Sequence, residues 1–396
     1  MHANKRQNWI NTTIGEVLTF QRGFDITKKQ QETGPYPVIS SSGINSFHSS
    51  FKVNGPGVVI GRKGSLGTVF FIEKNYWPHD TTLWVKDFHG NDPKFAYYFL
   101  QIMHFEQYDC GASNPSLNRN HIHKIPVLYP NLPTQLKIAA ILSAYDDLIE
   151  NNTRRIKILE EMAQALYREW FINFRFPGRE EVPMVDSSLG EIPEGWEVKK
   201  LGRIAKINAA SIKNSSSPEE IHYVDISSVS TGQIDKIERI SFSEAPSRAR
   251  RIVRHGDMIW SAVRPNRRSY SLILNPPLDL IVSTGFAVIS AKYAPYTYLY
   301  HALTTEDFVS YLTNHATGAA YPAVNAHDFE DANILFPPKE CLESFHLITK
   351  NFFDQRNILQ QKNTNLRRTR DILLPKLIAD DLDVDTLDIK TEGMTS

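Results

Sequence analysis

Two short cationic segments carry the side chains best suited to binding chemistry in this 396-residue chain. Arg62, Lys63 and Ser65 lie in a turn that contains two glycines, where a backbone can approach a ligand closely. In the second half, a comparable segment follows an apolar strand and contributes Arg264, Asn266, Arg267 and Arg268. Arginine can donate two hydrogen bonds to guanine, asparagine can pair with adenine, and lysine more often meets phosphate. We predict DNA contacts from both segments; the alternative is that both are solvated charged loops.

The charges of the chain balance overall, with 44 basic and 44 acidic residues, but they are unevenly distributed. Seven arginines lie between Arg248 and Arg268, opposed only by Asp257, and we add Arg250 and Arg251 of this cluster to the predicted DNA contacts. Arg119 is a further candidate. Its neighbour Asn118, like Asn325 later in the chain, is better interpreted as a turn residue. Residues 380–396 are rich in aspartate, and we expect an acidic, disordered tail there.

We searched the sequence for catalytic motifs, cofactor-binding loops and clusters of metal ligands. The segment Asn275–Leu278, Asn-Pro-Pro-Leu, is similar to the loop with which amino-methyltransferases grip a base, but Leu278 replaces the stacking aromatic residue. We also find no glycine-rich cofactor loop after a strand. His121, His123 and the pair His79-Asp80 lack the accompanying carboxylate or cysteine cluster of a metal site. We therefore expect no catalytic residue, no metal and no cofactor in this chain.

Composition sets the class of protein. The chain has room for two domains, 41% hydrophobic and 22% charged residues, and no apolar run long enough to span a bilayer. Its N-terminus lacks the apolar core of a signal peptide. Cys110 and Cys341 are its two cysteines, which is typical of thiols in a reducing compartment. We expect a cytoplasmic protein.

An internal repeat organises the segments that position these residues. Trp9 stands five residues before Ile14-Gly15, and Trp196 stands five residues before Leu201-Gly202. Far downstream, Pro-Ser-Leu-Asn ends at Asn118 and Pro-Ala-Val-Asn ends at Asn325, and a long helical segment follows each. The offset grows from 187 to 207 residues, so the second copy carries about twenty extra residues. Two copies with diverging loops indicate two related binding units.

Helical periodicity is strongest after each unit. Ten positions from Ile138 to Trp170 alternate spacings of four and three, which is a coiled-coil seam. Asn152 interrupts it, either to fix the register or because it faces water. The second helix has one thinner apolar line, so we expect it to pack antiparallel against the first, and we expect Pro375 to kink or stop it. The predicted packing residues are Leu142, Tyr145, Ile149, Asn152, Ile156, Leu159, Leu166, Phe352, Leu359, Leu366 and Leu373.

The whole pattern resembles the specificity subunit of type I restriction-modification enzymes. The resemblance is carried by the two Trp-to-Gly openings, by Val59–Ser65, by Gly256–Ile259, by Leu132–Gln135 and by Asp371–Leu377. It implies an α+β fold, in which two mixed α/β target recognition domains are separated by two long helices that form an antiparallel coiled coil with pseudo-two-fold symmetry. Each domain would read half of a bipartite target in double-stranded DNA, and the helices would set the spacer.

The resemblance also implies partners. The helices would dock two methylation subunits, which carry S-adenosylmethionine, and restriction subunits would join them. We expect recognition domain 1 at residues 1–134, a central spacer helix at 135–178, a linker with recognition domain 2 at 179–338, and a C-terminal spacer helix at 339–379. Two alternatives stay open: a DNA adenine methyltransferase that acts alone, and a coiled-coil adaptor without a nucleic-acid role.

Overall fold

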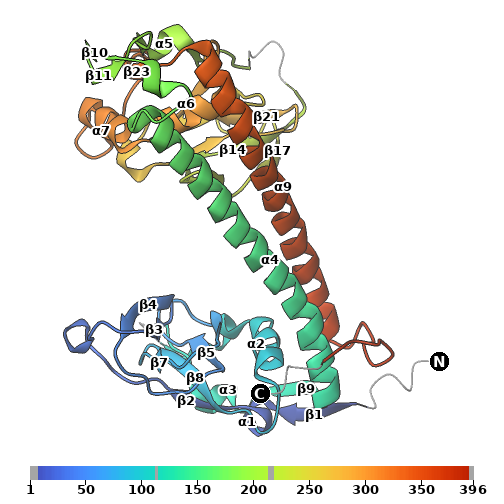
Figure 1. The fold of residues 1–396 in the computed structure, drawn as a ribbon. Helices are drawn as coiled ribbons and strands as arrows, with labels where there is room; N and C mark the ends of the chain where they lie inside the picture. Colours follow the sequence, from blue (N-terminus) through green and yellow to red (C-terminus); the bar gives the residue numbers. More distant parts are fainter. Residues whose placement is uncertain (1–7, 112–114, 213–217, 392–396) are drawn as a thin grey trace. The chain divides into compact units, whose positions relative to one another are not determined.

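Two compact units make up the chain in the computed structural model, which describes residues 8–111, 115–212 and 218–391. Unit 1 contains residues 1–152 and 362–396, and unit 2 contains residues 153–361 (Figure 1). The chain crosses from one unit to the other twice, each time inside a long helix.

Unit 1 is built on a four-stranded sheet with the strand order β2-β8-β5-β6, a three-stranded sheet β4-β3-β7 and a pair β1-β9. Helix α2 packs on the larger sheet through Phe95, Phe99 and neighbouring side chains. The bounds are β1 Trp9–Thr13, α1 Ile14–Val17, β2 Thr19–Arg22, η1 Lys28–Gln30, β3 Tyr36–Ser40, β4 Gly43–His48, β5 Gly57–Gly61, β6 Val69–Ile72, β7 Trp77–Pro78, β8 Thr82–Asp87, α2 Pro93–Gln101, η2 Phe105–Tyr108, α3 Arg119–Ile122 and β9 Pro126–Pro130.

Unit 2 repeats this plan with additions. Its sheets have the orders β13-β22-β19-β20, β17-β14-β21-β18 and β12-β23, with the hairpins β10-β11 and β15-β16. The bounds are η3 Arg168–Ile172, η4 Arg179–Glu181, β10 Met184–Ser187, β11 Gly190–Pro193, β12 Glu197–Lys200, α5 Leu201–Ile204, β13 Ala205–Ile207, β14 Glu220–Val224, η6 Ile226–Ser228, β15 Val229–Ser230, β16 Gln233–Ile234, β17 Glu238–Ser241, β18 Ala249–Ile252, β19 Met258–Ser261, η7 Pro265–Arg267, β20 Tyr270–Leu272, β21 Leu280–Ser283, β22 Phe286–Ala291, α6 Tyr296–Ala302, α7 Glu306–His315, α8 Ala326–Glu330 and β23 Asn333–Phe336.

The predicted repeat is confirmed at the level of topology. In each unit the tryptophan of the repeat, Trp9 or Trp196, is buried at a short strand that pairs antiparallel with a strand just before the long helix, β1 with β9 and β12 with β23. In each unit the central strand, β5 or β19, lies between two antiparallel neighbours. Unit 2 has an extra helix, α7, and a four-stranded second sheet where unit 1 has three strands. These additional elements of unit 2 contribute to the growth of the repeat offset from 187 to 207 residues.

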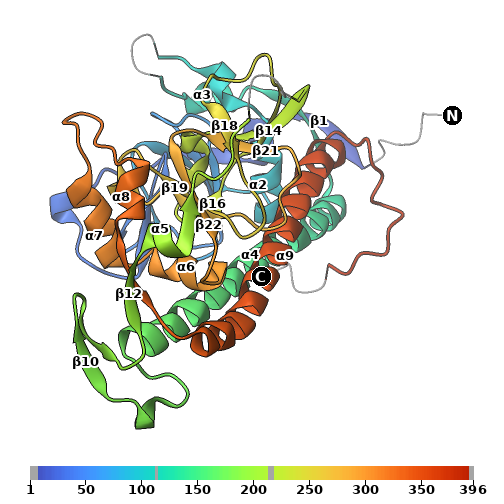
Figure 2. The ribbon, with the colours of Figure 1, turned by 90° about the horizontal axis from the view of Figure 1, so that it is seen from above.

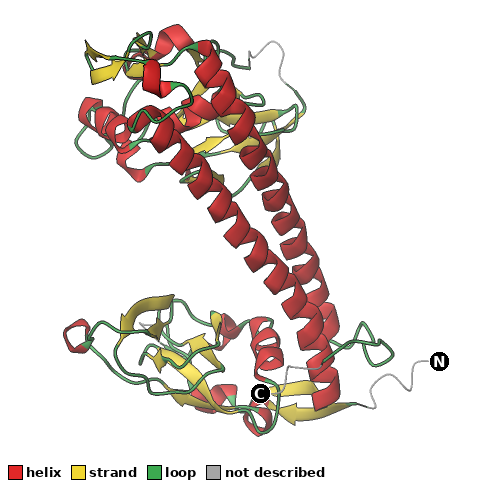
Figure 3. Cartoon of the chain, viewed as in Figure 1, coloured by secondary structure: helices red, strands yellow, loops and turns green. Residues whose placement is uncertain are grey.

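Two long helices, α4 Leu132–Tyr167 and α9 Lys339–Ile378, pair antiparallel (Figures 1, 2 and 3). In unit 1, Asp146 of α4 meets Arg370 of α9, and in unit 2, Glu160 of α4 meets Arg356 of α9. Residue numbers increase along α4 while those of its partners on α9 decrease, so the two helices are antiparallel, as the sequence predicted. The helix α4 passes into the short π-helical turn η3 and ends before Phe174, whose φ is 52°.

The predicted seam faces inward along α4. Leu142 and Ile149 are buried, while Tyr145, Ile156, Leu159 and Leu166 are half-buried. On α9, Leu359 is buried, and Phe352, Leu366 and Leu373 are half-buried. Asn152 does not face water: it is buried and its Nδ2 donates to Asn363 Oδ1 at 2.9 Å. A buried amide pair tolerates few alternative alignments, which favours the register-fixing interpretation.

Two expectations about the C-terminus are wrong. Pro375 does not stop α9, which runs on to Ile378, because the proline ring is exposed and its missing N–H removes a single hydrogen bond near the helix end. The acidic segment is not a free tail between Asp380 and Thr391. Val384 is buried in unit 1, Asp385 accepts hydrogen bonds from Thr134 and Asn8, and Lys137 binds three carbonyls of the segment. Residues 392–396 lie outside the described part of the chain.

The helix ends belong to the cores of the units. The unit 1 core combines β-sheet residues such as Val58 and Ile60 with Leu142 of α4 and Leu377 of α9. In unit 2, Phe345 of α9 packs among Tyr167, Trp170 and Phe171 at the end of α4. The sheets of each unit are thus anchored to its own stretch of the helix pair by buried apolar surface. Among the described residues, no helix has both the length and the apolar content that crossing a membrane requires.

Candidate nucleic-acid interface

An open hollow of about 540 Å³ in unit 1 collects cationic and amide side chains from three separate segments. Arg22 and Gln21 come from β2, Arg62 from the turn after β5, and Arg119 and Asn118 from the start of α3. Guanidinium and amide groups offer the donors that pair with base edges and phosphates. The structure therefore brings the predicted residues Arg62 and Arg119 to one surface and adds Arg22 to them.

The turn that carries Arg62 and Lys63 is fixed by its backbone. Gly61 donates to Thr68, and its carbonyl accepts from Gly67 at 2.9 Å; both Arg62 and Lys63 donate to the Thr81 carbonyl. A side chain at Gly61 would place its Cβ 2.0 Å from the Ser65 carbonyl oxygen, so the turn requires glycine there. Lys63 and Ser65 are exposed. The result is a rigid, tight platform for cationic side chains.

A second segment is bound to this turn. Lys63 forms a β-bridge with Ser116, and Leu117 donates to the Arg62 carbonyl at 3.0 Å. Asn118 then caps α3 by accepting from Asn120, which confirms its interpretation as a turn residue. Arg119 follows at the first turn of α3 and is exposed. This pairing explains why residues more than fifty positions apart share one hollow. Residues 112–114 of the connecting segment lie outside the described residues.

Asp80 holds two of the arginines in place. Arg22 forms an ion pair with Asp80 Oδ2 at 2.7 Å, and Arg62 Nη1 donates to the Asp80 carbonyl at 3.3 Å. Burial works to raise the pKa of the Asp80 carboxyl, but the Arg22 hydrogen bond and the neighbouring positive charges lower it from its ordinary value. Half of the Arg22 side chain stays exposed, so its remaining donors point to solvent. Sequence reasoning missed Arg22 because a lone arginine at a strand end carries no motif.

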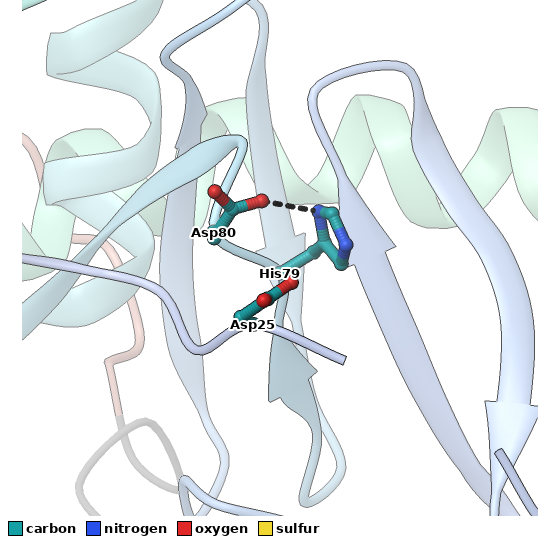
Figure 4. Close-up of side chains that lie close together, drawn as sticks. All are labelled: Asp25, His79 and Asp80. Carbon is teal, nitrogen blue, oxygen red and sulfur yellow. Dashed lines mark ion pairs between the residues drawn. The ribbon is translucent and has the colours of Figure 1, made fainter. Parts of the chain in front are cut away.

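A neighbouring hollow of about 500 Å³ shares Arg22 with the first and is lined also by Asp80, Phe24 and Trp77. Lys52 lies over the Trp77 ring, 4.9 Å from its centroid. Figure 4 shows Asp25, His79 and Asp80 together, and their potential ligand atoms lie within 4.8 Å of one another. Arg22 already forms an ion pair with Asp80, and Lys52 adds positive charge, so we assign this cluster to the electrostatics of the binding face.

The comparable turn of unit 2 follows β19. Arg264 and Arg268 have positive φ values of 51° and 55° and flank the single turn η7. Arg264 stacks on Tyr321 at 4.5 Å and donates to the Ala320 carbonyl, while Arg268 forms an ion pair with Glu306. Asn266 and Arg267 are exposed, and no ion pair or side-chain hydrogen bond joins them to the described residues. Asn266 and Arg267 are therefore the side chains that this turn presents.

The same pairing of two segments recurs in unit 2. Val263 forms a β-bridge with Ala323, as Lys63 does with Ser116. Asn325 caps α8 by accepting from His327 and Asp328, as Asn118 caps α3. Both units thus present a cationic turn after the central strand, joined to a proline-containing segment that ends in a capped helix. The sequence showed only that the two turns occupy corresponding positions of the repeat. The structure shows that each turn is also paired with the corresponding segment before the capped helix.

Arg250 and Arg251 lie elsewhere, on β18 of the second sheet. Arg250 stacks on Phe242 at 5.0 Å, and burial lowers the pKa of Arg251. No hollow or polar contact of the described residues joins them to η7. The arginine cluster of the sequence is divided between two sheets, and DNA contact by this pair stays a prediction.

Other candidate groups have structural roles. His123 Nε2 accepts from the Phe20 backbone at 2.9 Å, and burial lowers its pKa; His121 Nδ1 lies 2.9 Å from Cys110 Sγ. In Asn275–Leu278, Leu278 is fully exposed and Leu280 donates to the Pro277 carbonyl, as in a turn.

Comparisons with known proteins agree with the resemblance seen in the sequence. Residues 6–161 match the family described as the Type I restriction modification DNA specificity domain. The type I restriction enzyme MjaIX specificity subunit of Methanocaldococcus jannaschii is 26% identical over 305 residues, 74% of this chain and 70% of that protein. The HindI specificity subunit of Haemophilus influenzae is 21% identical over 328 residues, 67% of this chain and 70% of that protein. Over residues 6–161 the chain is thus similar to a type I DNA specificity domain, and both relatives are type I specificity subunits.

The fold of this chain also has a solved counterpart. The crystal structure of a type I restriction-modification S subunit from M. genitalium superposes with a TM-score of 0.65 at 16% identity, covering 96% of this chain and 98% of that one. The family match spans the recognition domain of unit 1 and most of α4. Unit 2 follows the same topology through the internal repeat.

Proposed function

We propose that this specificity subunit reads a two-part sequence in double-stranded DNA, with one half-site contacted by each unit. The doubled reading arrangement carries the proposal: a fixed cationic turn bridged to a capped helix occurs once in each unit. In unit 1 the contacts come from Arg22, Arg62 and Arg119, and in unit 2 from Asn266 and Arg267. Lysine and arginine contacts to phosphate supply affinity, and contacts to base edges supply specificity.

We propose further that the chain is non-catalytic and that the helix pair sets the spacer between the half-sites. Two methylation subunits, which carry S-adenosylmethionine, dock on the helices and methylate an adenine in each half, and restriction subunits join that assembly. The name of the M. jannaschii relative, a specificity subunit of a type I restriction enzyme, supports this division of labour. The Asn275–Leu278 turn supports it as well, because its leucine offers no ring to stack on a flipped base.

Mapping of methylated adenines in cells that carry the complete system tests the reading. Arg62→Ala should relax or abolish recognition of one half-site, and Arg267→Ala should do the same for the other, each by roughly 1–3 kcal/mol of discrimination. Arg203→Ala, an exposed arginine on α5 outside both reading turns, is the matched control and should leave the motif unchanged. A motif that survives both reading-turn substitutions unchanged would overturn these assignments.

Purified chain tests the non-catalytic role. Without a partner, the chain should transfer no methyl group to DNA. After a methylation subunit is added, the mixture should methylate DNA. Methyl transfer by the isolated chain would establish the stand-alone methyltransferase instead. The adaptor alternative requires that the assembled complex show no salt-sensitive DNA binding.

A further inference from the structure

A buried three-residue contact joins the recognition domain of unit 1 to both long helices. The Tyr98 hydroxyl on α2 donates to Asp146 Oδ2 on α4 at 2.5 Å, and Arg370 Nη1 on α9 donates to Asp146 Oδ1 at 2.5 Å. Tyr98 is almost fully buried, and about three quarters of the Asp146 and Arg370 side chains are buried. Each carboxylate oxygen of Asp146 is therefore held by a different element. We call these three residues clasp 1.

Unit 2 contains a comparable contact, which we call clasp 2: Arg356 on α9, Glu160 on α4 and Gly232 in the β15–β16 turn. Arg356 Nη2 donates to the Gly232 carbonyl, and Arg356 Nε lies 2.7 Å from Glu160 Oε1, an ion pair by distance although the N–H does not point along that line. The Arg356 side chain is 6% exposed, and Tyr300 of α6 contacts it. Again an arginine of α9 and a carboxylate of α4 meet a group of the recognition domain.

The internal repeat does not explain why the two clasps are alike. At the offset of 207 residues, Asp146 corresponds to Phe353 and Arg370 corresponds to Ala163, neither of which can form an ion pair. The clasps therefore use different positions, and α9 supplies the cation in both. Duplication alone would have given the two helices exchanged roles. The two clasps therefore use unrelated positions of the repeat. Each nevertheless forms a polar, directional link between a recognition domain and the helix pair.

Directionality distinguishes the clasps from the apolar packing around them. Burial of apolar surface stabilises a domain on a helix pair but tolerates small rotations and shifts, because it depends on area. Charge-assisted hydrogen bonds are short and angular, and a partly buried charge is costly to leave without its partner. A clasp therefore selects one orientation among those that apolar packing allows.

We propose that Tyr98, Asp146 and Arg370 are positioning residues that fix the orientation of recognition domain 1 on its helices, and that Arg356 and Glu160 do the same for domain 2. This inference rests on the proposed reading of a bipartite target. Its consequence is that the clasps, together with helix length, determine which gap between half-sites the complex accepts. They touch no DNA, so they leave the half-site sequences themselves unchanged.

Mapping of methylated adenines in cells with the complete system tests this. Tyr98→Phe removes one hydroxyl and keeps the ring; Arg370→Gln removes the ion pair. We expect both to raise methylation at sites whose gap differs by one base pair by about tenfold relative to the wild-type gap, with the same half-site sequences. Tyr129→Phe is the matched control, since it also deletes one buried hydroxyl of unit 1, one without a hydrogen-bond partner among the described residues, and it should leave the gap preference unchanged.

The outcomes separate this inference from the proposed function. A mere loss of stability would lower methylation evenly at all gaps, whereas loss of positioning redistributes it between gaps. If Tyr98→Phe and Arg370→Gln proteins fold and keep the wild-type gap preference, the clasps have no positioning role. If the wild-type complex yields no bipartite motif at all, the proposed function itself fails. Should Arg370→Gln not fold, Tyr98→Phe alone decides the inference, because it deletes a single oxygen atom.

Discussion

Replacing Gly61 by alanine tests how strictly the first reading turn must keep its shape. The added Cβ would lie 2.0 Å from the Ser65 carbonyl oxygen and 3.2 Å from the Ser41 carbonyl oxygen, whereas ordinary contacts begin near 3.4 Å. Both nearest atoms belong to the backbone, so no flexible side chain can move aside. To reach an ordinary contact the turn must open by about 1.4 Å, the difference between 3.4 and 2.0 Å.

The magnitude follows from what the opening breaks. Overpacking costs about 1–3 kcal/mol, and each backbone hydrogen bond lost from the turn, such as that from Gly67 to Gly61, adds roughly 0.5–1.5 kcal/mol. The core of unit 1 is built from other residues, and we expect it to stay folded. The displaced Arg62 would lose base contacts worth about 1–3 kcal/mol, which corresponds to a roughly 10- to 100-fold weaker complex with cognate DNA.

Fluorescence anisotropy on the assembled complex measures this change. Three duplexes are compared: the cognate site found by methylation mapping, and two sites with one half scrambled. Gly61→Ala should bind the cognate duplex roughly 10- to 100-fold more weakly than wild type, should discriminate less against the duplex with half-site 1 scrambled, and should still discriminate half-site 2. Gly90→Ala is the control, because its Cβ meets no atom within 4 Å although its φ of 78° adds strain. A folded Gly61→Ala complex that discriminates both halves normally would refute the assignment of this turn as a reader.

Three further predictions concern stability, each measured by urea denaturation of the purified chain. Burial, with the charge of Arg356, lowers the pKa of His301 to about 3. An unfolded histidine takes up its proton near pH 6.5, so stability that is full above pH 6.5 is lost as the pH falls below it, by up to about 1.4 kcal/mol per pH unit. His301→Phe should reduce that slope, and an unchanged slope would contradict the buried neutral imidazole. Phe345→Ala should destabilise unit 2 by about 3–5 kcal/mol, and a loss below 1 kcal/mol would deny its central packing role. Asn152→Leu should cost about 1–2 kcal/mol by removing the buried bond to Asn363, and adding Asn363→Leu should recover part of that loss; additive losses would rule out coupling of the two amides.

Much of the architecture could be predicted because it depends on local patterns. The alternation of apolar positions from Ile138 to Trp170 specifies one buried helix face, and α4 buries that face. The strand β5 forms on the β-branched run Val58-Val59-Ile60 between two glycines, a local pattern with few alternatives. Pro375 misled the prediction, since a proline ring is tolerated where its helix face is exposed and little helix follows.

The acidic segment after Ala379 shows a second limit. Five aspartates indicate disorder when the segment is considered alone. Lys137, Thr134 and Asn8, each more than 240 residues distant, give the segment its partners. Pairing over such separations leaves no local pattern in the sequence.

By itself, the sequence determined the two-fold repeat, the helix pair and the cationic turns that carry Arg62 and Arg267, because these follow from residue periodicity and turn chemistry. Only the tertiary structure decided which side chains share a surface. It added Arg22 to Arg62 and Arg119 through Asp80, separated Arg250 from Arg267, and joined Tyr98 to Asp146 and Arg370. These groupings depend on strand order and helix register, which place residues far apart in the chain within hydrogen-bonding distance.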